Sequence, residues 1–329
     1  MTWSYPNGFS VSQAIAYANF CQQAYFQYYV LANTPPDFGY PAFTKFMQLP
    51  PSGYRLLYNL WYNEGVFEWD PVYFGYVACS QTDSTQVVIA IRGTENSEEW
   101  YDDIMDSMQV NSPIQNSQGL VHQGFAIIYN GQAGADGKGL LYYTPPSGPL
   151  VPPTSADQPV PLSTVLSGAK SVVVTGHSLG AALSVLLTLD IALNIKCPVS
   201  SYNFASPMVG DPIFANCFNQ LLGETTPPIS ANYRVANGMD VVPNLPSNVF
   251  YAPGSPQEWN YMQVNGYCPV DSGILSVLAD AHSLSNYAIG LNNLNGPPQA
   301  VTSSQRGAAG LRSIPRWQDK KTKPSQRAA

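Results

Sequence analysis

Charged residues, histidines and long apolar runs are all scarce in this sequence. Charged side chains make up 11% of the 329 residues, and three residues are histidines. No stretch of about 18 consecutive apolar residues occurs, so a membrane-spanning helix is not expected. The five cysteines are odd in number and show no Cys-x-x-Cys spacing, which argues against a zinc site and a complete disulfide framework. These absences argue against a transmembrane protein and against a zinc module.

Apolar and turn-forming residues are abundant instead. Apolar residues account for 45% of the chain, which is long enough to bury a large core. That balance is typical of a loop-rich globular enzyme rather than a disordered chain. Residues 9–30 predict an amphipathic helix, and no basic residue precedes Lys45, so no signal peptide is expected in the chain as given.

Short apolar runs predict the strands of a sheet, and helical patterns lie between some of them. Residues 130–161 are rich in Gly and Pro, and we interpret them as an inserted loop. Strands are expected at residues 74–79, 86–91, 172–175, 200–204 and 232–235, and helices at residues 120–129 and 181–195.

A Gly-x-Ser-x-Gly pentapeptide, Gly176 to Gly180, follows the apolar run 171–174 and precedes the helical pattern that starts at residue 181. A serine at so tight a turn exposes its hydroxyl, and the flanking glycines let strand and helix approach without Cβ clashes. The pattern therefore predicts a nucleophile elbow with Ser178 as the nucleophile, and acyl transfer as the chemistry.

A nucleophilic serine needs a base, and the base needs an orienting carboxylate. His177 adjoins the serine with its side chain turned away, and His122 precedes it in the chain, so structural roles are expected for both. The order Ser, acid, His that is typical of such elbows leaves His282 as the base. Of the seven acidic residues between Ser178 and His282, Asp240 follows a predicted strand directly, and sites are assembled where strands end.

With these residues the chain resembles the class 3 lipases over residues 10–290. The motifs that carry the resemblance occur in one order: Ile91-Arg92-Gly93-Thr94, Val121-His122-Gln123-Gly124-Phe125, the Gly-His-Ser-Leu-Gly elbow, Phe204 through Gly210, Arg234 through Pro243, and Asp280-Ala281-His282-Ser283. The sequence departs from the family at two positions: Ala205 replaces a usual glycine, and Met208 a common arginine.

The resemblance implies an α/β-hydrolase fold, with a largely parallel central sheet flanked by helices and a lid helix. It implies the same three residues, Ser178, Asp240 and His282, as nucleophile, orienting carboxylate and base. It further implies an oxyanion hole formed by Thr94 and by the backbone N–H of Leu179. No metal or other cofactor is expected.

Residues 95–108 combine apolar residues at helical spacing with six acidic side chains. The resemblance implies that this segment is the lid, with Trp100, Ile104 and Met108 on its apolar side. By the same resemblance Asp103 matches an aspartate that holds the oxyanion hydroxyl. An ordinary surface helix is the alternative interpretation, in which Asp103 is a solvated charge.

Charge divides the chain into two parts. Residues 297–329 hold seven basic residues and one acidic residue, so residues 1–296 keep 7 basic and 20 acidic residues, a net charge of −13. We therefore expect an α/β-hydrolase catalytic domain at residues 1–296 and a basic, disordered tail at residues 297–329. Nucleic acid and anionic membranes are not expected partners of an acidic body, because like charges oppose encounter.

The sequence thus predicts a serine carboxylic-ester hydrolase, a lipase that cleaves acylglycerols or related esters at a lipid–water interface through an acyl-enzyme intermediate. A phospholipase A1 or a feruloyl-type esterase on the same scaffold is the alternative. A non-catalytic interaction protein is a further alternative, although such proteins usually lose triad residues. Oligomeric state and cellular location are not predicted.

Overall fold

The computed structural model describes residues 4–32, 50–63, 70–94, 108–130, 139–143, 151–222, 231–251, 256–273 and 281–294. These residues all belong to one compact unit, Met1–Pro298. Within them, no helix combines the length and the apolar character that a membrane crossing requires.

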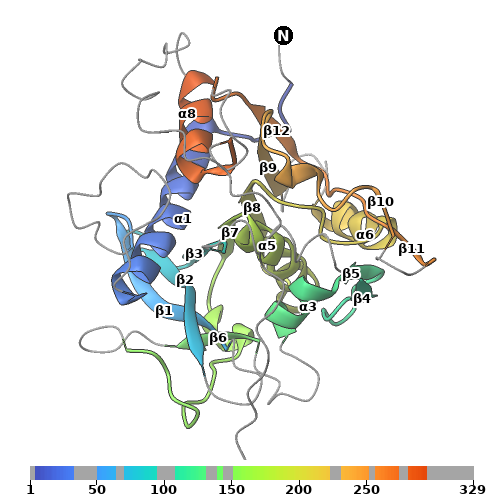
Figure 1. Ribbon diagram of the computed structural model, residues 1–329. Coiled ribbons are helices and arrows are strands. Elements are labelled where there is room, and N and C mark those ends of the chain that lie inside the picture. Colours follow the sequence, from blue (N-terminus) through green and yellow to red (C-terminus); the bar gives the residue numbers. More distant parts are fainter. Residues whose placement is uncertain are drawn as a thin grey trace, which may run out of the picture. The chain divides into compact units, whose positions relative to one another are not determined.

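An eight-stranded sheet forms the centre of this unit, with strand order β12-β9-β8-β7-β3-β2-β1-β6 (Figure 1). Neighbouring strands from β12 to β3 pair in parallel, whereas β2, β1 and β6 are added antiparallel. The predicted α/β class with a largely parallel sheet is therefore confirmed. The strands are β1 (Tyr54–Asn63), β2 (Pro71–Ser80), β3 (Gln86–Ile91), β6 (Leu140–Tyr143), β7 (Ser171–His177), β8 (Val199–Phe204), β9 (Ala231–Asn237) and β12 (Tyr267–Val270).

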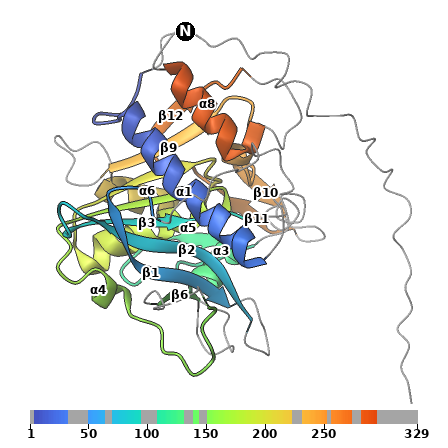
Figure 2. The same ribbon diagram turned by 90° about the vertical axis from the view of Figure 1, so that its left-hand side faces the viewer.

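Helices cover both faces of the sheet (Figure 2). On β7, Val172 and Val174 belong to the core cluster of α5, whereas Val173 and Thr175 pack toward α1. Because alternate side chains of a strand point to opposite faces, α5 and α1 lie on opposite sides of the sheet. The helices are α1 (Val11–Ala32), α3 (Gln123–Asn130), α4 (Leu162–Val165), α5 (Leu179–Asp190), α6 (Pro212–Leu222) and α8 (Leu284–Leu294), with a π-helical turn at Ile191–Ile195 and a 3₁₀ turn at Val242–Asn244.

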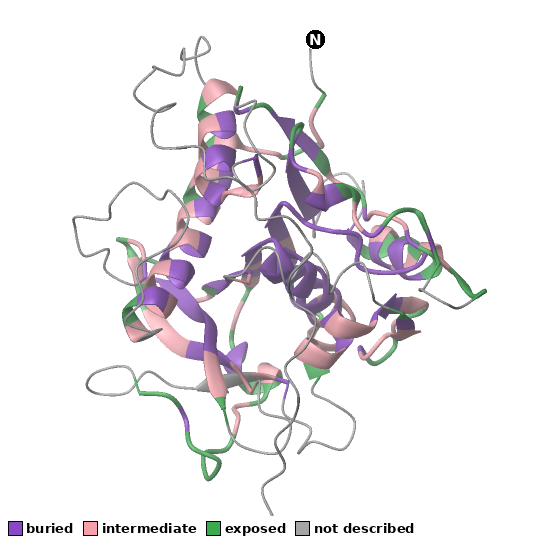
Figure 3. Cartoon of the chain, in the orientation of Figure 1, coloured by how far each residue is buried: buried purple, intermediate pink, exposed green. Residues whose placement is uncertain are grey.

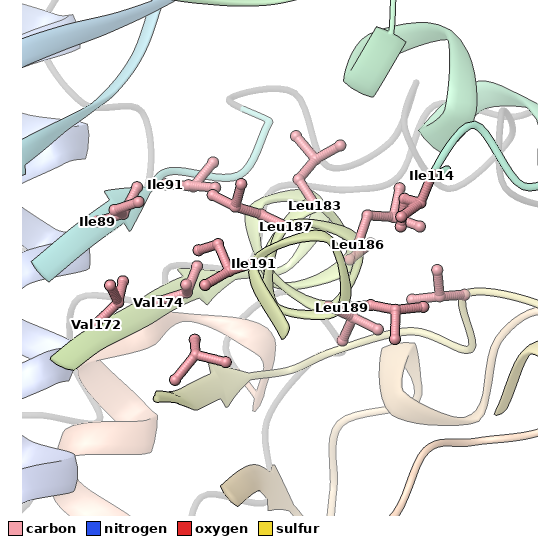
Figure 4. Packing of buried hydrophobic residues seen from close by; sticks show 14 of the residues in the cluster. Ile89, Ile91, Ile114, Val172, Val174, Leu183, Leu186, Leu187, Leu189 and Ile191 are labelled. Atoms are coloured by element: carbon pink, nitrogen blue, oxygen red, sulfur yellow. The ribbon is translucent and has the colours of Figure 1, made fainter. Parts of the chain in front are cut away.

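Helix α5 is buried on all sides (Figure 3). Leu187 of this helix points toward Ile91 of β3, and both belong to one core cluster with Ile89 and Val174 (Figure 4). A helix without a polar face can lie only inside a core, so its sequence fixes it against the centre of the sheet. The N-terminus of α5 is thereby held at the end of β7.

The interpretation of residues 130–161 as an inserted loop was wrong in part. Residues 140–143 form β6, which pairs with β1 at the sheet edge.

Two short ribbons complete the described strands: β4 (Gln109–Asn111) pairs with β5 (Leu120–His122), and β10 (Val249–Tyr251) with β11 (Glu258–Asn260).

Candidate active site

The pentapeptide forms a strained turn between β7 and α5. Ser178 has φ 59° and ψ −125°, a backbone conformation that non-glycine residues rarely adopt. A Cβ at Gly176 would overlap the carbonyl oxygen of Gly180, and a Cβ at Gly180 would overlap the carbonyl oxygens of Ile91 and Arg92, so both glycines are needed for the strand and helix to meet this closely. The turn leaves the Ser178 hydroxyl at the carboxyl edge of the sheet.

Three side chains that are distant in sequence meet at this turn. His282 Nε2 lies 2.8 Å from Ser178 Oγ, and His282 Nδ1 lies 2.9 Å from Asp240 Oδ2. The structure therefore brings together the serine, histidine and aspartate that the sequence predicts as a triad. An ionised Asp240 places the imidazole proton on Nδ1, which leaves Nε2 able to accept the Ser178 proton.

Asp240 is held in a buried polar pocket. Its Oδ2 accepts a hydrogen bond of 2.6 Å from the Tyr287 hydroxyl, and its Oδ1 accepts one of 3.0 Å from the Val242 N–H. Burial alone raises the pKa of Asp240, but His282 and these hydrogen bonds outweigh it and leave the pKa below its ordinary value. Asp240 is thus kept as a carboxylate although it is removed from water.

His177 forms a second buried connection behind the site. Its Nε2 lies 2.8 Å from the backbone oxygen of His282, and its Nδ1 lies 2.8 Å from the Tyr25 hydroxyl. Tyr25 in turn accepts a 2.8 Å hydrogen bond from the Gly93 N–H. Burial, followed by the neighbouring His282, lowers the pKa of His177 to about 3, so this ring is neutral at ordinary pH.

The two predicted oxyanion residues are held next to the serine turn. Leu179 is the first residue of α5, where backbone N–H groups have no partner within the helix. A Cβ at Gly93 would lie 2.9 Å from Ser178 Cβ, so the chain leading to Thr94 passes directly beside the nucleophile turn. The Thr94 hydroxyl is buried and has no hydrogen-bond partner within the described part of the chain.

The predicted lid lies mostly outside the described residues. This applies to Trp100, Asp103 and Ile104, whose roles stay predictions; Met108 is described and exposed. Among the described residues, no group of three or more His, Cys, Asp or Glu side chains is arranged to hold a metal ion.

Sequence reasoning did not find the two tyrosines that contact the site. Tyr287 follows His282 by five residues and is buried on α8, but a spacing of five does not place two residues on one face of a helix, so helical periodicity did not mark this tyrosine. Tyr25 comes from α1, more than 150 positions before His177, and no local pattern marks it among the 21 tyrosines.

Comparison with known proteins agrees with this geometry. Residues 88–250 match the family model described as lipase (class 3). A phospholipase A1-II of Oryza sativa subsp. indica is 28% identical, covering 58% of this chain and 53% of that protein. A secreted mono- and diacylglycerol lipase of Malassezia globosa is 40% identical over 92 residues, 27% of this chain and 28% of that protein.

The chain spans about half the length or less of the curated relatives it matches. Among solved structures, the Lip2 lipase from Yarrowia lipolytica has the same fold, with a TM-score of 0.53 and 22% identity over 82% of this chain and 81% of that one. The matched segment contains the elbow with Ser178 and the loop with Asp240, and the fold places His282 beside both. Over residues 88–250, about half of its length, this chain matches the class 3 lipase family.

Proposed function

We propose that this chain is a serine carboxylic-ester hydrolase that cleaves acylglycerols. The observation that carries the proposal is the continuous hydrogen-bonded chain from Ser178 through His282 to Asp240 on a strained turn. Such a chain activates a hydroxyl that is otherwise a poor nucleophile. The match of residues 88–250 to the class 3 lipase family supports the same chemistry.

In this mechanism Ser178 Oγ attacks the ester carbonyl carbon, and its proton moves to His282 Nε2. The bond to the alcohol then breaks, and the same proton is transferred to the leaving oxygen. A water molecule attacks the acyl-enzyme, gives a proton to His282, and releases the fatty acid as Ser178 recovers its proton. Asp240 holds the imidazole and stabilises its charged form.

Negative charge develops on the carbonyl oxygen during both attacks. We assign its stabilisation to the N–H groups of Leu179 and Thr94 and to the Thr94 hydroxyl, which has no partner among the described residues. In comparable sites the loss of one such donor slows turnover by about 10²–10³-fold.

Labelling with a fluorophosphonate tests the serine chemistry. The probe should label the unmodified chain, and Ser178→Ala should abolish labelling and lower turnover of p-nitrophenyl butyrate by at least about 10⁴-fold with folding retained. Ser247→Ala, which changes an exposed serine, is the matched control and should be labelled normally. Retention of more than a few per cent of turnover by Ser178→Ala would refute the proposal.

A second candidate is a phospholipase A1, which the names of the rice relatives favour. Release of oleate from diolein and from dioleoyl phosphatidylglycerol, an anionic phospholipid, compared in mixed micelles at equal surface density, separates the two. We expect faster release from diolein, because the strongly acidic body repels the phosphate group. Faster release from the phospholipid would favour the second candidate.

A further inference from the structure

Arg92 is a buried arginine just past the carboxyl end of β3, two residues before the predicted oxyanion residue Thr94. Its guanidinium carbon lies 3.8 Å from the ring centroid of Tyr28 and 4.8 Å from that of Phe74. Its Nε donates to the Tyr73 carbonyl at 2.6 Å, and its Nη1 donates to the Gly93 carbonyl at 2.7 Å. Rings and carbonyls thus fix the plane of the guanidinium.

The second of these hydrogen bonds reaches the peptide group that serves the site. The Gly93 carbonyl and the Thr94 N–H belong to the same planar peptide, so a donor on the oxygen also determines where the N–H points. A charged donor gives a strong hydrogen bond, and bonding at the carbonyl makes the N–H of that peptide a better donor. In a buried setting this effect is only weakly screened by water.

The preceding peptide is held from the other side. The Gly93 N–H donates to Tyr25, and a Cβ on Gly93 would lie 2.7 Å from the carbonyl oxygen of His177. Residue 93 therefore has no room for a side chain and lies close to both Tyr25 and the serine turn. With its N–H fixed by Tyr25, the contact from the described residues that holds the following peptide is the Arg92 hydrogen bond.

We propose that Arg92 is a positioning residue for the oxyanion: through the Gly93 carbonyl it orients and polarises the Thr94 N–H. This inference rests on the proposed ester hydrolysis. By this inference the buried Arg92 guanidinium helps to stabilise the transition state, in addition to its hydrogen bond to the Tyr73 carbonyl of β2.

Arg234 provides a matched comparison within the same molecule. It is also buried, its Nε donates to the Val264 carbonyl at 3.3 Å, and its guanidinium lies 5.1 Å from the Tyr267 ring centroid. It lies on β9, three strands away from β3, and its carbonyl partner is outside the serine turn. The two arginines share burial and stacking and differ in the peptide that they hold.

The test compares Arg92→Met, Arg92→Lys and Arg234→Met in the full chain. Three quantities are measured: kcat and KM on p-nitrophenyl butyrate, the inhibition constant of butylboronic acid, whose serine adduct is anionic, and that of neutral butyramide. Arg92→Met should lower kcat at least about tenfold and raise the inhibition constant of the boronic acid by a similar factor. KM and the inhibition constant of butyramide should change less than about threefold. Arg92→Lys, which keeps the charge but reaches one carbonyl, should be intermediate.

Arg234→Met should lower the melting temperature without changing the ratio of boronic acid to butyramide affinity. Equal weakening of both inhibitors by Arg92→Met, or an unchanged kcat, would overturn the inference and leave Arg92 with a packing role only. If Arg92→Met does not fold, Arg92→Lys decides by the same criteria. Failure of the unmodified chain to hydrolyse the ester would instead refute the proposed function.

Discussion

At the scale of single residues, the site depends on groups that hold the reacting side chains rather than react themselves. Tyr287 holds the carboxylate Asp240, and His177 joins the backbone of His282 to Tyr25. Each of these bonds is 2.6–2.8 Å long and involves buried groups, where an unpaired polar atom costs about 1–3 kcal/mol. The loss of any one of these hydrogen bonds should therefore lower turnover or the free energy of unfolding.

Tyr287→Phe removes one hydrogen bond to Asp240. Since that bond lowers the pKa of Asp240 while burial raises it, the pKa should rise in the variant. More of the carboxylate is then protonated at acid pH, so the loss of kcat/KM should grow as the pH falls from 8 to 4, from about tenfold at neutral pH. The check is a pH–rate profile, with Tyr233→Phe as control because that hydroxyl binds the Asn7 carbonyl instead. A loss that does not depend on pH would contradict the argument.

The buried His177 should make the stability depend on pH. Its pKa falls from the ordinary histidine value of 6.5 to about 3 in the folded chain. Below pH 6.5 the unfolded chain gains a proton that the folded chain does not. As the pH is lowered from 6.5 to 3, the free energy of unfolding therefore decreases by up to about 1.4 kcal/mol per pH unit. His177→Gln lacks this loss, so its deficit against the unmodified chain should shrink between pH 7 and pH 4 in urea unfolding. A constant deficit would show that His177 does not titrate in this way.

Chain order and residue type were enough to predict which residues meet at the site. Three histidines left one base, and strand position selected one of seven acids. Tyr25 and Arg92 could not be found in this way, because their contacts depend on how α1 and β2 pack against β3. Such packing has no signature in local spacing.

At the scale of elements, the strands that carry the site were predicted from the sequence, whereas two strands near the sheet edge were not. Four strands lie close to the ranges predicted from the sequence, because each is an apolar run that ends at a turn: β3, β7, β8 and β9. β1 was not predicted: it has a buried Asn59, and its burial pattern does not alternate. β6 was hidden in a segment whose Gly and Pro content indicated a loop.

The site depends on the contact between α5 and the sheet, and Gly180→Ala should disrupt this contact. A Cβ at this position would overlap the backbone carbonyl oxygens of Ile91 and Arg92, which cannot move without shifting β3. We expect a loss of more than about 3 kcal/mol in the free energy of unfolding, together with loss of turnover. Gly238→Ala is the control, because a Cβ there meets no heavy atom within 4 Å, and its stability should stay within about 1 kcal/mol. Urea unfolding of both variants checks the prediction, and equal stabilities would contradict it.

At the scale of the whole molecule, charge is distributed unevenly along the chain. The full chain has a net charge of −7, of which residues 299–329 contribute seven basic residues and one acidic residue. All described residues of the site lie before residue 299. The body is thus acidic where ester chemistry is proposed, and the opposite charge lies in a segment that carries no site motif.

Deletion of residues 299–329 should therefore leave turnover on a soluble ester nearly unchanged, while the net charge moves from −7 to −13. Because the deleted segment is the one basic part of the chain, any attraction to anionic vesicles at low salt should fall with it. The measurements are p-nitrophenyl butyrate turnover, and co-sedimentation with phosphatidylglycerol and with phosphatidylcholine vesicles. Unchanged turnover with equal sedimentation of both proteins supports a passive tail. Loss of sedimentation on the anionic vesicles alone would instead assign the tail a surface-binding role, because only an electrostatic contact distinguishes the two lipids. Reduced turnover of a correctly folded, shortened chain on the soluble ester would show that residues 299–329 act on the site itself.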